Sequence, residues 1–165
     1  MKDFDPSILF ESLNTIIPVL SIFASYFLGR SQANIKFKRE QAQHRYSSFY
    51  APFFTRLYAG RLWELPPSSM KFEVRSIFLD LFTQNISLLG PKLQSLYADL
   101  HRAHCNLLWY ESGDSGYDSA PVEYDRIFMQ IVESAIAESK PLCRFLRLPP
   151  IAQAFETCLR NVRES

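Results

Sequence analysis

The sequence predicts an all-α protein in which an N-terminal transmembrane helix continues into a charged stalk and is followed by an antiparallel helical bundle. Three observations support this fold class. Residues 12–29 form a run of eighteen residues without a charge. Apolar residues then recur at helical spacings through most of the chain, and no segment shows the period of two that marks a strand. Short segments containing proline or glycine separate these stretches, as in connections between antiparallel helices.

The composition describes one folded domain and excludes several classes of protein. A chain of 165 residues has room for one domain, and 47% hydrophobic residues exclude a disordered or low-complexity chain. Three cysteines rule out a disulfide framework, and five scattered glycines cannot form a phosphate-binding loop. Because 18 Lys and Arg stand against 17 Asp and Glu, we expect no nucleic-acid partner.

The uncharged run is the predicted membrane segment, within a region that we place at residues 1–29. As a helix it covers about 27 Å, close to the roughly 30 Å of a hydrocarbon core. Pro18 is compatible with a spanning helix, since neighbouring hydroxyl side chains can bond the freed carbonyl. The alternative is an N-terminal core helix of a soluble domain. A cleaved signal peptide is disfavoured because the first five residues, MKDFD, are net negative.

Charged residues around this run predict its orientation. Residues 1–29 hold one Lys and three acids, whereas residues 30–61 hold seven bases and one acid. The positive-inside rule therefore predicts a single-pass protein of the cell (inner) membrane, with its N-terminus outside and residues 30–165 in the cytoplasm. Within the basic juxtamembrane stalk, 30–45, we expect four bases to contact anionic lipid headgroups at about 1 kcal/mol each. These are Arg30, Lys36, Lys38 and Arg39.

The predicted cytoplasmic bundle, 46–165, begins with a strongly aromatic helix. Its buried stripe is Tyr46, Phe49, Tyr50, Phe53, Phe54, Leu57 and Tyr58. These residues recur at spacings of three, four and seven, the pattern of one wide helical face. Pro52 predicts a kink or short break near Ala51. Residues 65–68, Leu-Pro-Pro-Ser, are expected to end the helix and to supply the N-cap of the next one.

The remaining helices are bounded by proline and glycine. We expect a second helix at 69–89, which Gly90 closes in the left-handed conformation, and a third that Pro91 opens and that ends near Tyr110. A surface loop follows at 112–121, then a fourth helix at 122–138. A short segment at 142–148 and a final helix at 151–162 flank Pro149 and Pro150.

Two stretches resemble a known pattern. The sequence RYSSFYAPFFTRL, followed about forty residues later by NISLLGPKLQSL, is similar to small bacterial and phage single-pass membrane proteins of unassigned function. The resemblance covers about half of the chain and rests on Tyr50, Pro52, Phe53, Leu57, Asn85, Leu88 and Leu89. It implies one N-terminal membrane helix, a basic juxtamembrane stretch and a cytoplasmic helical bundle, and it implies no particular activity.

Few residues form a pattern that could carry chemistry. His101, His104 and Cys105 lie at positions i, i+3 and i+4 of one helix and are the weak candidate for a metal site. A closed zinc site needs a fourth ligand at a recognised spacing, which the sequence lacks, so we expect these residues to flank the buried stripe. The acids of 114–125 lack the spacing of a calcium-binding loop. We therefore predict no catalytic, cofactor or metal site.

These observations favour a membrane-anchored cytoplasmic helical interaction module without catalytic activity, with the lipid bilayer and an unidentified protein as partners. The alternative is a membrane-acting effector or toxin, in phage defence or exclusion, whose transmembrane helices self-associate into a homo-oligomer. Polar residues of the predicted span, such as Asn14 and Ser21, would mediate that association. A third hypothesis is a metal-dependent enzyme that uses His101, His104 and Cys105.

Overall fold

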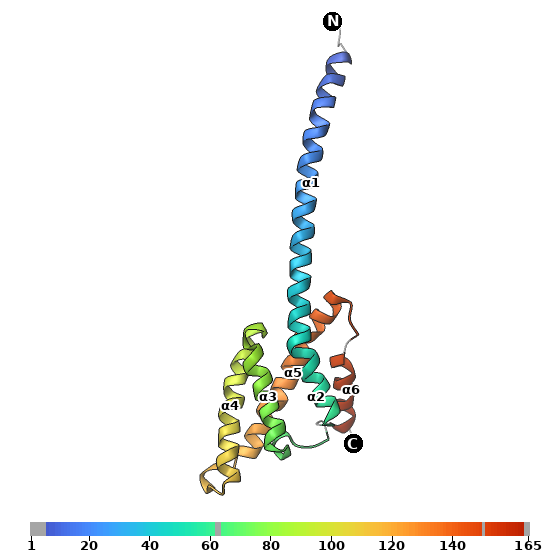
Figure 1. Ribbon diagram of the computed structural model, residues 1–165. Helices are drawn as coiled ribbons and strands as arrows, with labels where there is room; N and C mark the ends of the chain where they lie inside the picture. The colour runs from blue at the N-terminus through green and yellow to red at the C-terminus, as the bar shows by residue number, and fades with distance from the viewer. Residues whose placement is uncertain (1–5, 62–63, 150, 164–165) are drawn as a thin grey trace. The chain divides into compact units, whose positions relative to one another are not determined.

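The computed structural model describes residues 6–61, 64–149 and 151–163, with side chains mostly from Phe23 onward (Figure 1). Its α-helices are α1 (Pro6–Arg45), α2 (Ala51–Ala59), α3 (Phe72–Asn85), α4 (Pro91–Glu111), α5 (Ala120–Leu146) and α6 (Ile151–Arg163). Shorter 3₁₀ or π segments occupy Tyr46–Tyr50, Pro67–Ser69, Ile86–Leu88 and Ser115–Tyr117. Within these described ranges there is no strand, so the predicted all-α class is confirmed.

The chain divides into two compact units, Met1–Gln41 and Ala42–Ser165. In the first unit, every described side chain from Phe23 to Gln41 is exposed, including large apolar ones such as Phe27 and Leu28. In the part of the chain that the structure describes, no helix has both the length and the hydropathy needed to cross a bilayer. Most of the predicted span, residues 12–22, lies outside the described side chains, so the membrane segment stays a prediction.

The second unit is a helical bundle with an aromatic core, as predicted. Its two longest helices, α4 and α5, run antiparallel and pack along their length (Figure 1). The aromatic stripe forms the centre of the core: Phe49 meets Phe82 with ring centroids 4.8 Å apart, and Phe53 meets Phe78 at 5.6 Å. Tyr58 is the one partly exposed member of the predicted stripe, whose other members are buried.

The α-helical hydrogen bonding is interrupted next to Ala51, where the sequence predicts a kink or short break, but the chain does not leave the helical conformation. The backbone stays helical at Ala51, and the hydrogen-bond pattern widens instead, because Ala51 N–H bonds to the carbonyl of Tyr46, five residues back. Pro52 has no N–H to offer the carbonyl four residues before it. A π turn just before the proline changes the hydrogen-bond register there without interrupting the helix.

The connection between α2 and α3 also differs from the prediction. The first bundle helix ends at Ala59, and α3 begins at Phe72 with Lys71 as its N-cap residue. Ser68 and Ser69 therefore do not cap α3. The Ser68 backbone N–H and hydroxyl both donate to Asp125 of α5, while the Ser69 hydroxyl donates to the carbonyl of Pro66. A long-range carboxylate partner has taken the place of local capping.

Two further boundaries correct the sequence prediction. Gly90 is extended, with φ −71° and ψ 160°, and does not close α3 in the left-handed conformation. The predicted fourth helix does not stop at residue 138, since α5 continues through Pro141 to Leu146 and absorbs the segment expected to be separate. Arg147, at φ 58° and ψ 39°, provides the left-handed residue that ends α5. The predicted bounds of α4 and α6 agree with the structure within one residue.

Candidate functional site

The four bases predicted to contact lipid lie on α1 and are all exposed. Lys36 is paired with Glu40 at 3.9 Å, and both side chains are mostly in solvent. At 3.6 residues per turn, the four bases point in directions about 60 to 120° apart around the helix axis. They therefore surround α1 instead of forming one basic face. Such a distribution suits a helix surrounded by headgroups better than one that docks a single side against a folded partner.

Helix α4 places the three residues of the weak metal candidate in different environments. His104 is 5% exposed and packs between the rings of Phe72 and Tyr124, with centroid distances of 5.8 and 6.2 Å. His101 is exposed, and its Nδ1 lies 3.9 Å from the sulfur of Cys105. Adjacent positions on a helix differ by about 100°, so His104 and Cys105 cannot share one direction. The described residues contain no group of three His, Cys, Asp or Glu side chains placed to bind a metal ion.

A buried arginine that sequence reasoning missed joins three helices. Arg75 of α3 is 1% exposed, and its guanidinium donates two hydrogen bonds of 2.7 Å to the carboxylate of Glu111 on α4. A third bond of 3.0 Å goes to the carbonyl of Ser68, whose N–H and hydroxyl are held by Asp125 of α5. The available signal was its position three residues before Phe78 on the apolar face of α3. The two-pronged pairing holds α3 against α4, and the bonds between Ser68 and Asp125 connect the same group to α5.

Next to this pair lie buried polar atoms that no described protein group satisfies: Arg75 Nε, His104 Nδ1 and Tyr124 Oη. Burial lowers the pKa of His104, with the charge of Arg75 as the second cause, and Glu111 acts in the opposite direction. Burial likewise raises the pKa of Tyr124. The helices thus hold His104 neutral at physiological pH.

Glu138 of α5 is the centre of a second polar network. Its Oε2 accepts a 2.7 Å hydrogen bond from the Tyr50 hydroxyl and a 3.0 Å bond from the Gly90 N–H. The Arg45 guanidinium lies 3.7 Å from the same oxygen, and its Nε donates to the carbonyl of Leu88. Burial and then the bond to Glu138 raise the pKa of Tyr50. These contacts join the end of α1, the start of α4 and α5, and their role is structural.

An apolar groove lies on the surface where α2 ends and α3 begins, with a volume of about 460 Å³. Its lining is mainly aliphatic and aromatic, and the charged lining residues that the structure describes are both basic. The lining residues that the structure describes are Arg56, Ala59, Gly60, Leu65, Ser69, Met70, Lys71, Val74, Ile77 and Phe78. Leu65 is 59% exposed and Ile77 is 44% exposed. The bundle therefore presents apolar side chains to solvent beside two bases.

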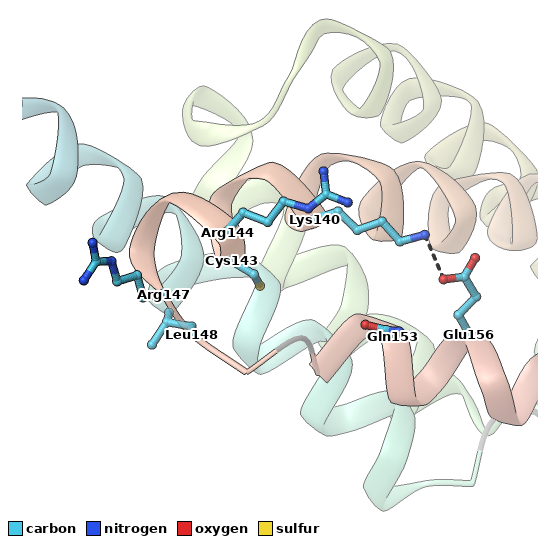
Figure 2. Close-up of a pocket in the computed structure, with 7 residues that line it drawn as sticks. All are labelled: Lys140, Cys143, Arg144, Arg147, Leu148, Gln153 and Glu156. Carbon is cyan, nitrogen blue, oxygen red and sulfur yellow. Dashed lines mark ion pairs between the residues drawn. The ribbon is translucent and has the colours of Figure 1, made fainter.

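A second cavity of about 350 Å³ lies between the end of α5 and α6 (Figure 2). Figure 2 shows Lys140 and Arg144 extending in the same direction along α5, whereas Arg147 points away from both. The ammonium of Lys140 is 2.8 Å from a carboxylate oxygen of Glu156 on α6. The other lining residues are Cys143, Leu148 and Gln153. The sequence signal for this cavity was the spacing of the three bases at i, i+4 and i+7, which sequence reasoning did not use.

Compared with known protein families, curated proteins and solved structures, the chain matches none of them. The resemblance to small bacterial and phage membrane proteins therefore stays a prediction.

Proposed function

We propose that this chain is a membrane-anchored helical interaction module without catalytic activity of its own. In this proposal residues 12–29 span the cell (inner) membrane, with the N-terminus outside and the bundle in the cytoplasm. The observation that carries the interaction role is the exposed apolar groove at the junction of α2 and α3. Exposed apolar side chains that line a groove are typical of a site that binds another protein segment.

Features of α1 support the anchor. Near the end of the uncharged run, Tyr26, Phe27 and Leu28 are 61 to 64% exposed, so a bilayer would cover three large apolar side chains. Aromatic residues followed by bases are the usual sequence at the cytoplasmic end of a membrane helix. The four bases of the stalk surround the helix over about 14 Å of its length, as expected for contact with a layer of anionic headgroups.

The groove fits one kind of partner, an amphipathic helix with acidic residues beside its apolar face. A hollow of about 460 Å³ accommodates a few large apolar side chains from one helical face. Arg56 and Lys71 lie in its lining, with no acid among the described lining residues, so acidic flanks would be attracted and basic flanks repelled.

The docking site is tested on the full chain with a fluorescently labelled acidic amphipathic peptide and a second peptide in which Lys replaces every acid. We expect the acidic peptide alone to bind. Replacing Ile77 by Asp should weaken binding by about tenfold or more, because a partly buried aliphatic contact is lost and an acid is introduced. The matched control is Val122→Asp on α5, which changes a side chain that is 73% exposed and outside the groove.

Several outcomes would contradict the docking proposal. Equal binding of both peptides, or equal effects of the Ile77 and Val122 substitutions, would remove the groove from the interaction. If a second copy of the chain occupies the groove, the result is different. Neither peptide would bind, and Ile77→Asp would change the oligomeric state, as measured by sedimentation.

The anchor is tested by replacing Arg30, Lys36, Lys38 and Arg39 with Gln. Insertion should survive because the span is uncharged, but orientation should become mixed, since it depends on the difference in Lys and Arg across the span. Protease protection of the C-terminal bundle measures this. Recovery of the wild-type chain from the soluble fraction without detergent would refute the anchor. Toxicity on overexpression that requires residues 8–29 would instead favour the self-associating effector.

A further inference from the structure

We propose that one ordered water molecule binds inside the bundle at the junction of α3, α4 and α5, where it is hydrogen-bonded to Arg75, His104 and Tyr124. Each helix contributes one of these residues. The site is separate from the apolar groove and from α1, so it does not depend on the proposed docking or anchoring role.

The first argument is the set of buried polar atoms without a partner at this junction. Nε of Arg75, Nδ1 of His104 and Oη of Tyr124 are buried and bonded to no described protein group. The three residues are 1%, 5% and 0% exposed, so bulk solvent does not reach them. Buried polar atoms in folded proteins are almost always bonded to protein or to ordered water. Three of them from three neighbouring helices therefore indicate a shared ligand.

The second argument is that the three residues lie close together. The rings of His104 and Tyr124 have centroids 6.2 Å apart. The charge of Arg75 acts on the pKa of both residues, so its guanidinium lies near both rings. Two atoms bonded to the same water lie about 4 to 5.5 Å apart, because each hydrogen bond measures about 2.7 to 3.0 Å. One water can therefore bridge residues at this separation.

The third argument is that the donors and acceptors of these groups match those of water. Arg75 Nε–H can only donate, and Nδ1 of a neutral His104 accepts when the ring proton is on Nε2. Burial lowers the pKa of His104 and keeps the ring neutral. A water that accepts from Arg75, donates to His104 and bonds the Tyr124 hydroxyl makes three hydrogen bonds, the usual number for a buried water.

The charge balance of the junction argues for a neutral ligand over an anion. The terminal nitrogens of the Arg75 guanidinium each donate a 2.7 Å hydrogen bond to a carboxylate oxygen of Glu111. The positive charge is thus already paired, and a buried anion beside it would have no cation of its own. Phe72, which stacks on His104, has no polar side-chain atom to offer Nδ1. A small neutral molecule that both donates and accepts fits these requirements.

The first test is a crystal structure of the full chain in neutral detergent, at a resolution that shows ordered water. We expect one water within hydrogen-bonding distance of Arg75 Nε, His104 Nδ1 and Tyr124 Oη. A direct hydrogen bond between Tyr124 Oη and His104 Nδ1, or side chains packed together with no water between them, would overturn the site.

The second test detects the water in solution, through the nuclear Overhauser effect between water protons and Arg75 Nε–H in the full chain. The wild type should show this signal, and His104→Phe should lose it because the acceptor Nδ1 is removed. The Tyr124 hydroxyl exchanges its proton with solvent and could relay a signal. Because this variant keeps the hydroxyl, a relayed signal would persist in it.

The matched control is His101→Phe, which changes an exposed histidine of the same helix and should keep the signal. Circular dichroism on both variants checks that the helices remain. Absence of the signal in the wild type, its persistence in His104→Phe, or equal loss in both variants would refute the bridging water.

Discussion

Replacing Gly90 by Ala tests the Glu138 network at one atom. An added Cβ at this position would lie 2.5 Å from Oε1 and 2.6 Å from Oε2 of Glu138, closer than any real contact. The backbone itself permits Ala, because φ is −71° and ψ is 160°. The reduced entropy of the unfolded chain favours Ala by about 0.4 to 1 kcal/mol, and the preference for Gly over Ala at an N-cap offsets it. The backbone terms therefore nearly cancel.

The carboxylate must then move, which removes its bonds to the Tyr50 hydroxyl and the Gly90 N–H and its contact with Arg45. A hydrogen bond to a charged group contributes about 1.5 to 3 kcal/mol when buried. The Glu138 side chain is 22% exposed, so water compensates part of the loss. We expect Gly90→Ala to lower the free energy of unfolding by about 2 kcal/mol.

The assay is urea denaturation followed by circular dichroism on four proteins: wild type, Gly90→Ala, Glu138→Ala and the double variant. With no carboxylate to displace, Gly90→Ala should cost close to nothing in the Glu138→Ala background. The coupling energy of the cycle should therefore be about 2 kcal/mol. An equal cost of Gly90→Ala in both backgrounds would refute the clash, and no cost in the wild type would refute the network.

Three further predictions concern stability. Glu111→Gln should lower the free energy of unfolding by about 2 to 3 kcal/mol because it leaves the buried charge of Arg75 uncompensated. The control is Asp99→Asn, which breaks an exposed ion pair and should change the free energy of unfolding by less than about 0.5 kcal/mol. Similar effects of the two substitutions would show that the buried charge of Arg75 is not the cause. Because the folded chain holds the pKa of His104 below its unfolded value of about 6.5, this residue should make stability fall as pH drops below that value. His104→Phe should reduce that slope in urea titrations between pH 7 and pH 5, and an unchanged slope would assign it to other groups. Arg147→Gly should raise the melting temperature, because Gly adopts the left-handed conformation without the cost of about 1 kcal/mol that Arg incurs. A lower melting temperature would show instead that the Arg147 side chain stabilises the end of α5.

Hydropathy and periodicity were sufficient for the class of the fold and most of its elements. Buried residues at positions 46, 49, 50, 53, 54 and 57 follow directly from a spacing that any helix imposes on its own side chains. Pro91 opens α4 as predicted because its missing N–H is unneeded at a helix start. These features depend only on residues that are close together in the chain, so they can be predicted from the sequence.

The sequence prediction failed where a distant partner changed a local preference. The fourth helix was expected to end at residue 138, yet α5 continues through Pro141 to Leu146, whose side chain is buried in the core. Ser68 should have capped α3 but is held by Asp125, which lies 57 residues away. Gly90 was expected to be left-handed, although what it provides is room for a carboxylate 48 residues away.

The candidate sites divide in the same way. The bases of α1 and the uncharged run before them are properties of consecutive residues, so the sequence alone determines the hypothesis of a membrane anchor. The apolar groove is lined by residues 56–78 and the α5–α6 cavity by residues 140–156, so each is formed by consecutive elements. The way those elements fold back on each other decides which of their side chains line the groove and the cavity. The physical reason is that helical periodicity fixes which face of a helix is apolar. Which other face covers it, and which part is left exposed, depends on how all the helices pack at once.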